Sequence, residues 1–210
     1  MGDAKTIEVS SRAAISRARL FEVASSQGGY FTTEQARECG ISRALLAHHV
    51  KSGRFIRVRR GLYRFREYPP SPREEVLAAW LALGRDRVVV SHESALDLLE
   101  LSDVVPTKVH MTVPRSRRHL PSLPGVKIHT SSKPFHREDL VVRDGISVTS
   151  ATRSIIDSAE SGTAPEQVEM AVAQAITRGQ ATRDQLRVRS AERSRRVATL
   201  ISRALDRALV

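Results

Sequence analysis

The side chains with the clearest chemical potential in this sequence are arginines gathered in one short segment. Residues 54–65, RFIRVRRGLYRF, alternate apolar and basic residues on both sides of an Arg-Arg-Gly turn. Period-two alternation around a glycine turn predicts a β-hairpin with an apolar inner face. The arginines then project toward solvent, where guanidinium groups can pair with phosphates. These residues are Arg57, Arg59, Arg60 and Arg64.

The residues just before this hairpin predict a helix with one free face. Ser42 is a favourable N-cap, and Ser52-Gly53 closes the segment. At about 100° per residue, one side of this helix is apolar and must pack inward. That side consists of Ile41, Leu45, Leu46, His49 and Val50. The opposite side carries Arg43, Ala44, Ala47 and Lys51, with His48 at its flank.

The free face has the composition of a helix that reads the major groove of double-stranded DNA. Arg43 can donate two hydrogen bonds to guanine O6 and N7, while Ala44 and Ala47 permit close approach and contact with thymine methyl groups. His48 is a further candidate for base contact. Candidates for phosphate contact are Thr32, Thr33, Ser42 and Lys51. The alternative is a solvated charged face on an ordinary helix, which the basic hairpin that follows makes weaker.

Two further helices must position this one. Residues 11–25 follow a helical pattern that the Gln-Gly-Gly-Tyr segment at 27–30 ends. Thr32 then starts a short helix, with Gln35 three residues on as its capping-box partner, and Gly40 stops it. A short helix, a glycine turn and a Ser-capped second helix form a helix-turn-helix, and the hairpin is its wing.

The distribution of charge indicates the same kind of partner. The 210 residues include 34 Lys and Arg against 23 Asp and Glu, a formal net charge of +11. Residues 1–68 carry 13 basic and 6 acidic residues (+7), residues 69–158 carry 12 and 11 (+1), and residues 159–210 carry 9 and 6 (+3). Nucleic acid is the commonest partner of so basic a protein. A generally basic surface would not concentrate the surplus in the first third.

Composition excludes several protein classes. Cys39 is the single cysteine, which excludes an internal disulfide framework and a Cys-rich zinc site and suits a reducing cytoplasm. The polar first residues lack a secretory h-region. The apolar run Val76–Leu83 is too short to span a bilayer. We therefore expect a cytoplasmic protein without membrane contact.

The expected fold class is α+β, with an N-terminal winged helix-turn-helix followed by a small α+β domain with a helical C-terminus. Three prolines in EYPPSPREE indicate a linker at 67–72, between domains at 1–66 and 73–210. The second domain begins with an amphipathic helix. Short strands are predicted at 88–90, 108–113, 126–129, 140–143 and 146–148.

The last part of the chain is expected to be helical. Pro165 suits a first helical position, and Thr182 with Gln185 forms a capping box. Apolar residues then recur at helical spacing, at Val197, Leu200, Ile201, Ala204, Leu205 and Ala208. This stripe is expected to dock within the chain, and docking of a partner is the alternative. The nearby arginines fit either a solvated face or a second basic patch; they are Arg193, Arg195, Arg196, Arg203 and Arg207.

No segment has the residues of a recognisable catalytic or cofactor site. A P-loop, a G-x-G-x-x-G, a G-x-S-x-G elbow and the Gly-Ser dipeptide of nucleotidyltransferases are absent. The single nuclease-type triplet, Asp3-Ala4-Lys5, falls in an expected loose terminus. The seven histidines show no metal-ligand spacing. In Ser91-His92-Glu93 we expect Ser91 to cap a helix, and we expect His49 to be a satisfied core residue. We predict no enzyme activity, no cofactor and no metal.

The segment from Gly29 to Phe65 resembles the N-terminal winged helix of AbiEi-type antitoxins of type IV toxin–antitoxin systems. It shares their threonine-capped helix before Gly-Ile-Ser, the glycine after the recognition helix and the Arg-Arg-Gly-x-Tyr turn. The resemblance continues in residues 91–96 and 145–153 and covers roughly residues 15–160. It implies an antitoxin that represses its own operon, with a nucleotidyltransferase-like toxin encoded beside it. It also implies that the C-terminal part carries the antitoxic activity without needing direct toxin contact.

These observations predict a sequence-specific double-stranded DNA-binding transcriptional repressor, and the resemblance implies that it acts on its own operator. The alternative from a different class is a non-enzymatic scaffold whose winged helix binds protein or RNA. Binding through basic side chains must weaken steeply with salt, because phosphate contacts release counterions, whereas apolar docking must not.

Overall fold

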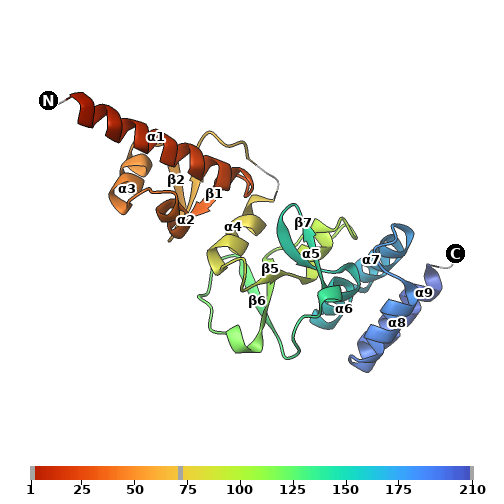
Figure 1. The fold of residues 1–210 in the computed structure, drawn as a ribbon. Coiled ribbons are helices and arrows are strands. Elements are labelled where there is room, and N and C mark those ends of the chain that lie inside the picture. Colours follow the sequence, from red (N-terminus) through yellow and green to blue (C-terminus); the bar gives the residue numbers. More distant parts are fainter. Residues whose placement is uncertain (1–2, 71–72, 209–210) are drawn as a thin grey trace. The chain divides into compact units, whose positions relative to one another are not determined.

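The structure, a computed structural model, describes residues 3–70 and 73–208, with side chains from residue 14 onward. Contacts divide the chain into two compact units, Met1–Gly84 and Arg85–Val210. A three-stranded sheet lies in the first unit and a five-stranded sheet in the second. The fold class is α+β with a helical C-terminus, as predicted (Figure 1). Among the described residues, no helix has both the length and the apolar character needed to cross a membrane.

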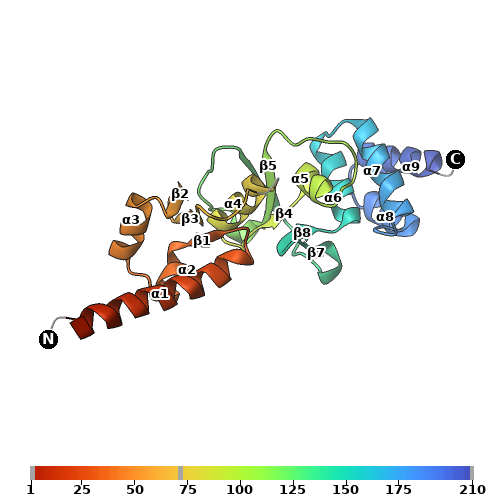
Figure 2. The same cartoon turned by 90° about the horizontal axis from the view of Figure 1, so that it is seen from above.

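The first unit has the order of elements of a winged helix-turn-helix. Its helices are α1 (Asp3–Ser25), α2 (Thr33–Glu38), α3 (Arg43–Lys51) and α4 (Glu74–Leu83). Its strands are β1 (Tyr30–Thr32), β2 (Phe55–Arg59) and β3 (Leu62–Phe65). The antiparallel hairpin β2–β3 is the wing, and β1 pairs with the other edge of β3 (Figure 2).

Two elements of this unit differ from the prediction. Helix α1 begins at Asp3 rather than Ser11, so the triplet at residues 3–5 lies on a helix and not in a loose terminus. No glycine or proline occurs between these two positions, and nothing therefore stops the helix from extending. Strand β1 was not predicted, because three residues are too few to show an alternating pattern.

The predicted helix ends are confirmed. The backbone N–H of Gln35 donates to the Thr32 hydroxyl over 3.2 Å, and the Gln35 side-chain oxygen accepts from the Thr32 N–H over 2.9 Å. The hydroxyl of Ser42 accepts from the Leu45 N–H over 3.2 Å. Gly40 adopts a φ of 84°, which a residue with a side chain rarely adopts. These caps determine where α2 ends and α3 begins.

An aromatic core holds the wing against the helices. The rings of Phe31, Phe55 and Phe65 have centroids 4.8–5.3 Å apart and are almost completely buried. Leu20 of α1 and Leu46 of α3 belong to the same cluster. Edge-to-face rings at such distances are favourable beyond their buried area. One cluster therefore joins α1, α3 and all three strands.

Helix α4 belongs to the first unit. It packs on β1 and β3, and its Glu74 forms an ion pair with Arg64 at 3.0 Å. The contact boundary falls after Gly84, whereas the linker expected from the prolines at residues 67–72 falls before α4. Prolines report on local backbone conformation, and the boundary between units depends on which surface an apolar helix covers.

The second unit contains a mixed five-stranded sheet in the order β6-β5-β4-β8-β7. The strands are β4 (Val89–Val90), β5 (Val109–Pro114), β6 (Val126–Ser131), β7 (Leu140–Arg143) and β8 (Ile146–Thr149). Strand β5 runs parallel to β6 and antiparallel to β4, and β4 runs parallel to β8. Helix α5 (His92–Leu98) follows β4, and two short 3-10 helices, η1 (Arg115–Arg117) and η2 (Arg137–Asp139), precede β6 and β7.

The chain ends in a group of packed helices. They are α6 (Ala151–Ser161), α7 (Pro165–Thr177), α8 (Arg183–Ala191) and α9 (Arg195–Arg207). The predicted first-turn position of Pro165 and the capping box of Thr182 with Gln185 are both confirmed. Val197, Ile201 and Leu205 are almost completely buried, with α9 packed on α7 and α8 (Figure 2). The apolar stripe of α9 therefore docks within the chain.

Candidate nucleic-acid interface

Helix α3 presents a polar face to solvent, and the structure places the predicted base-reading residues on it. Arg43, Ala44, Ala47 and His48 are exposed, as are the predicted phosphate residues Ser42 and Lys51. The predicted inner side is confirmed, since Ile41, Leu46 and His49 are buried and Leu45 and Val50 are half-buried. Helix α3 is thus anchored along one side and free along the other.

His49 anchors α3 from within the core. Its ring lies edge-on to Phe55 with centroids 4.8 Å apart. Burial lowers the pKa of His49, and the nearby positive charges of Arg54, His48 and Arg17 lower it further. The core position was predicted correctly, but the expectation of a satisfied histidine is wrong, because its Nδ1 has no hydrogen-bond partner. The Phe55 ring beside it offers contact area but no hydrogen-bonding group.

The wing carries two exposed arginines near its tip. Arg57 and Arg60 are exposed, while Arg59 is half-buried. The pairing of β2 with β3 shifts register between Arg57 and Arg59, which bends the strand where the basic residues lie. Gly61 closes the turn with a φ of 78°. The side chains predicted to meet phosphates therefore project from a hairpin that the core holds in place.

Arg64 corrects the predicted wing. Its side chain is only 12% exposed and forms an ion pair with Glu74 at 3.0 Å. It also donates to the Tyr68 carbonyl oxygen over 2.7 Å and lies over the Tyr30 ring. The alternation pattern assigned Arg64 to the solvent face. In the structure that face of β3, the central strand of its sheet, is covered by residues from α4 and the segment before it.

The wing turn is tied to the start of α2. The backbone N–H of Thr33 donates to the Gly61 carbonyl oxygen over 3.0 Å, and the Thr33 hydroxyl lies 3.4 Å from the same oxygen. The Thr32 hydroxyl serves as the cap of α2. Both threonines thus have structural partners as well as the predicted phosphate role. This connection depends on β1, which sequence reasoning missed.

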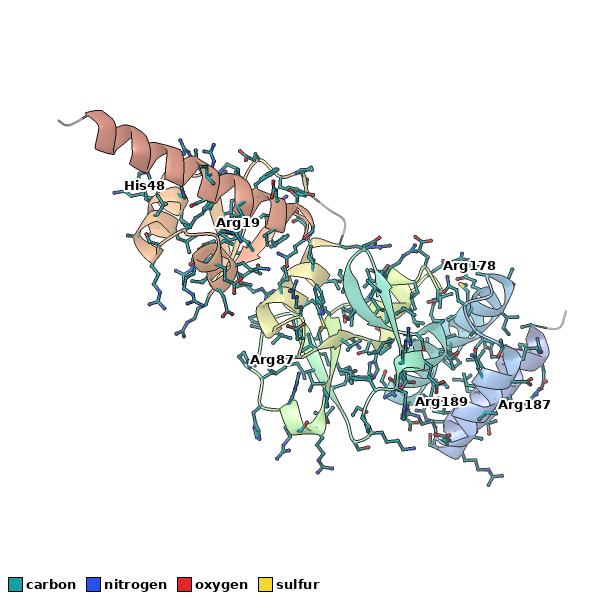
Figure 3. All side chains as sticks on the ribbon, viewed as in Figure 1. Arg19, His48, Arg87, Arg178, Arg187 and Arg189 are labelled. Carbon is teal, nitrogen blue, oxygen red and sulfur yellow. The ribbon has the colours of Figure 1, made fainter. Side chains whose placement is uncertain are left out.

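Further basic residues of the first unit were not among the predicted contacts. Arg17 and Arg19 of α1 and Arg54 before β2 are exposed, and Figure 3 shows Arg19 together with His48 of α3. Arg66 donates through Nε to the Gly53 carbonyl oxygen over 2.5 Å, which connects the end of α3 to the base of the wing. The excess of charge in residues 1–68 was the available signal for these side chains.

The two motifs noted in the sequence at residues 91–96 and 145–153 both lie in the second unit. Ser91 occupies the N-cap position of α5, as predicted, but its hydroxyl makes no capping hydrogen bond with the helix. The hydroxyl accepts a hydrogen bond from Thr112 over 2.6 Å and lies 2.9 Å from Nδ1 of His92. Strand β5 brings Thr112 next to Ser91, and the hydroxyl therefore turns toward the sheet rather than toward its own helix.

The motif at residues 145–153 ends in Arg153, which lies at the centre of an ion-pair network. Arg153 of α6 pairs with Asp157 at 2.7 Å and with Asp139 at 3.5 Å. Arg193 pairs with Asp157 at 2.8 Å, and Arg189 of α8 pairs with Asp139. Both aspartate side chains are under 8% exposed. Figure 3 shows Arg189 and its exposed neighbour Arg187 on α8. Arg153, Arg189 and Arg193 therefore stabilise the packing of α6, α8 and η2.

A polar cavity of about 890 Å³ lies beside this network. His92, His129, Ser131 and Lys133 are among its lining residues, together with the arginines and aspartates of the network. Arg193 and Arg196, which the sequence left between a solvated face and a basic patch, both have internal partners. Arg196 donates to the carbonyl oxygens of Ala159 and Glu160 over 2.9 Å each.

Comparison with known proteins agrees with the family resemblance that the sequence of the first unit indicated. Residues 18–66 match the family described as "Transcriptional regulator, AbiEi antitoxin". No curated protein matches the chain significantly. The fold resembles the crystal structure of the RV2827C protein from Mycobacterium tuberculosis, with a TM-score of 0.60 and 16% sequence identity over 92% of this chain and 77% of that chain. At that identity the likeness concerns the fold alone. Residues 18–66 of this chain are thus similar to the AbiEi antitoxin family, and the resemblance read from the sequence is confirmed over these residues.

Proposed function

We propose that this chain is a sequence-specific double-stranded DNA-binding repressor that acts on its own operator. In this proposal α3 lies in the major groove, where Arg43, Ala44, Ala47 and His48 meet base edges. Lys51 and the N-terminal residues of α2 and α3 contact phosphates, and the wing follows the backbone beside them. Arg64 is left out of this interface because it is paired inside the unit.

The exposed face of α3 is the observation that carries the proposal. A helix that enters a groove needs one side held by a core and the other side free of bulky apolar residues. In α3 the buried side packs on the aromatic core, and the free side combines two alanines with Arg43 and Lys51. The wing turn is hydrogen-bonded to α2, so the two basic surfaces belong to one rigid framework.

The same face argues against the scaffold alternative. Protein-docking surfaces use aromatic or large aliphatic anchors at their centre. In the described part of the first unit, the large hydrophobic residues that stand exposed are Ile15 and Phe21, and both lie on α1 rather than on α3. Double-stranded RNA is also a poorer partner, because its major groove is too deep and narrow for a helix to read.

A gel-shift titration of the full chain tests the proposal. The DNA is the fragment upstream of the protein's own gene, with a scrambled fragment as competitor, at two salt concentrations. We expect selective retention of the upstream fragment. Arg43→Ala should reduce the preference for that fragment by about 1–3 kcal/mol, which is the usual contribution of one bidentate base contact. Equal affinity for all fragments would exclude a specific regulator.

The wing is tested separately by an Arg59→Ala/Arg60→Ala double variant. Its affinity should fall for every DNA sequence alike, and the slope of log affinity against log salt should flatten by about 2 if both residues meet phosphates. Arg203→Ala, which removes one positive charge from exposed α9, is the control and should leave both quantities unchanged. A wing variant with an unaltered slope would remove the wing from the interface.

We further propose that the chain is the antitoxin of a type IV system with a nucleotidyltransferase-like toxin encoded beside it. The family description for residues 18–66 names an AbiEi antitoxin and supports this role. Co-expression with the neighbouring toxin gene should restore growth. Arg43→Ala should still restore growth while repression of the operon is lost, because the antitoxic activity is expected in the C-terminal part. Persistent toxicity with the wild-type chain would exclude the role.

A further inference from the structure

Three histidines that are far apart in the sequence meet on one face of the five-stranded sheet. His110 lies on β5 and His129 on β6, and the parallel register pairs Thr112 with His129. Because side chains two residues apart on a strand share a face, His110, Thr112 and His129 project together. His92 begins α5 directly after β4, the other neighbour of β5. The chain topology therefore assembles a cluster that no sequence spacing reveals.

The three imidazole rings are within reach of a common ion. Nε2 of His129 lies 3.2 Å from Nδ1 of His110. The His92 ring stacks on that of His129 with centroids 3.6 Å apart and lies 5.7 Å from that of His110. One ring nitrogen from each histidine lies within 4.8 Å of the other two. Two nitrogens bound to one Zn²⁺ at about 2.0–2.1 Å in tetrahedral geometry lie about 3.3 Å apart, which the His110–His129 pair already matches.

Burial affects the charge of all three rings. His92 and His110 are 7% and 6% exposed. Burial, followed by the neighbouring histidines, lowers the pKa of His92 to about 2, and burial lowers that of His129 to about 4. Burial also lowers the pKa of His110. Burial therefore disfavours the protonated, charged form of all three imidazoles.

Hydrogen bonds connect the cluster to the residues around it. The Ser91 hydroxyl, which accepts from Thr112, lies 2.9 Å from Nδ1 of His92, so Nδ1 has a protein partner and we assign Nε2 of His92 to the ion. The Ser94 hydroxyl accepts from the His110 backbone N–H over 2.9 Å. Such partners of the second ring nitrogen and of the strand backbone orient the ligands in natural metal sites.

The backbone at His92 supplies a second, independent observation. Its φ is 54°, in the left-handed region that residues with a side chain seldom adopt. Such a conformation costs of order 1–3 kcal/mol and persists where the surrounding structure imposes it, often at ligand sites. In this conformation the His92 ring stacks on that of His129.

We propose that His92, His110 and His129 form a binding site for one divalent transition-metal ion of the Zn²⁺ class, with its remaining coordination position open to the neighbouring cavity. The donor set consists of imidazoles without a carboxylate or thiolate. Such a set favours Zn²⁺, Cu²⁺ or Ni²⁺ over Mg²⁺ and Ca²⁺, which prefer oxygen. Binding requires the His92 ring to turn out of its stack on His129 so that its nitrogen approaches the other two.

The cavity gives the site its fourth position. His92 and His129 line this space of about 890 Å³, together with Thr112, Thr130 and Ser131. Three protein ligands and one position open to solvent or substrate characterise catalytic rather than structural zinc sites. The positive charge of Arg153 near the rings is offset by its ion pairs with Asp139 and Asp157, and Glu93 lies near His110 opposite the charges of Lys127 and Lys108. The site thus accommodates an ion without a large excess of positive charge beside it.

The test uses the purified full chain after removal of metals with a chelator. Isothermal titration with Zn²⁺ and visible absorption on titration with Co²⁺ measure stoichiometry and coordination. We expect one equivalent of either metal, a Co²⁺ spectrum with the intensity of four- or five-coordination, and a higher melting temperature with Zn²⁺. Failure to bind one equivalent would overturn the proposal and leave the cluster as a hydrogen-bonded histidine stack.

Variants distinguish this site from adventitious binding by surface histidines. His129→Gln, at the half-buried cavity wall, should weaken Zn²⁺ binding by more than about 100-fold, and Ser91→Ala, which keeps all three ligands, by about 10–100-fold. The exposed residue His119, which is not among the residues lining the cavity, provides the control His119→Gln, which should bind as the wild type does. Circular dichroism monitors folding of each variant. Loss of binding in the control, or its survival in folded His129→Gln, would refute the assignment.

Discussion

The two units of this protein use arginine in opposite ways. In the first unit Arg43, Arg57 and Arg60 extend into solvent from α3 and the wing. In the second unit Arg153 and its neighbours turn inward and pair with two buried aspartates. The net charge of each segment agrees with this contrast, because acidic residues of the second unit balance its buried arginines. Charge excess rather than arginine content therefore marks a candidate nucleic-acid surface.

The physical reason is hydration. An exposed guanidinium keeps its water and counterions until a phosphate replaces them, so it contributes to binding and little to folding. A buried guanidinium has lost that water and destabilises the fold unless a carboxylate pairs with it. Arg64 is instructive because it lies in the first unit but follows the rule of the second, with Glu74 as its partner.

The largest expected effect comes from breaking the buried network. Asp157→Ala leaves Arg153 and Arg193 without a shared carboxylate and should lower the free energy of unfolding of the second unit by about 3–5 kcal/mol. Urea denaturation followed by circular dichroism, with hydrogen exchange of α6 amides, measures this loss. Asp184→Ala is the matched control, since its pair with Arg187 is exposed and should contribute no more than about 0.5 kcal/mol. Equal effects of the two substitutions would contradict the contrast between buried and exposed arginines.

The next largest effect is expected for Arg64, which tests directly whether burial rather than position in the first unit decides the role of an arginine. Arg64→Ala should destabilise the first unit by about 1–3 kcal/mol, because Glu74 and the Tyr68 carbonyl oxygen lose a partly buried donor. Fluorescence of Trp80, the single tryptophan and part of α4, reports on this unfolding in urea. The salt slope of DNA binding should stay as in the wild type. A flattened salt slope with unchanged stability would show that Arg64 contacts DNA phosphates instead of stabilising the fold.

His49 predicts a pH dependence confined to the first unit. Its folded-state pKa is lowered from the ordinary value of 6.5, mainly by burial, while the unfolded chain binds a proton near that value. The stability it contributes is therefore complete above about pH 6.5 and is lost as the pH falls toward the folded-state pKa. The urea midpoint followed by Trp80 fluorescence should decrease between about pH 7.5 and 5.5. His49→Leu should make that decrease shallower, and identical pH profiles would show that other groups cause it.

The smallest expected effect is that of substitutions on α9, which should leave DNA binding unchanged. Arg195 and Arg203 are exposed on α9, and their double substitution by alanine removes as much charge as the wing double variant. If only the first unit binds DNA, affinity and salt slope should remain within error of the wild type, and stability within about 0.5 kcal/mol. A salt slope lowered as much as in the wing variant would show that the second unit also contacts DNA.

Much of the fold was predictable because its signals are local. The caps at Thr32, Ser42 and Thr182, the Arg-Arg-Gly turn and the stripe of α9 all depend on residues within a few positions of one another. The exposed and buried sides of α3 followed from helical periodicity for the same reason. The elements that the sequence did not predict, such as β1, exist because a distant strand offers hydrogen bonds to a segment too short to show a pattern.

The residues of the candidate sites can likewise be divided into those that local sequence predicted and those that distant contacts decided. The sequence by itself determined where the basic helix and hairpin lie and which of their side chains alternate outward. Only the tertiary structure decided that Arg64 turns inward to Glu74, that Ser91 bonds to Thr112 instead of capping α5, and that His92, His110 and His129 meet. Local backbone preferences are encoded within a few residues, whereas partners for buried polar groups are supplied by strands and helices that are remote in the chain and are brought together only by packing.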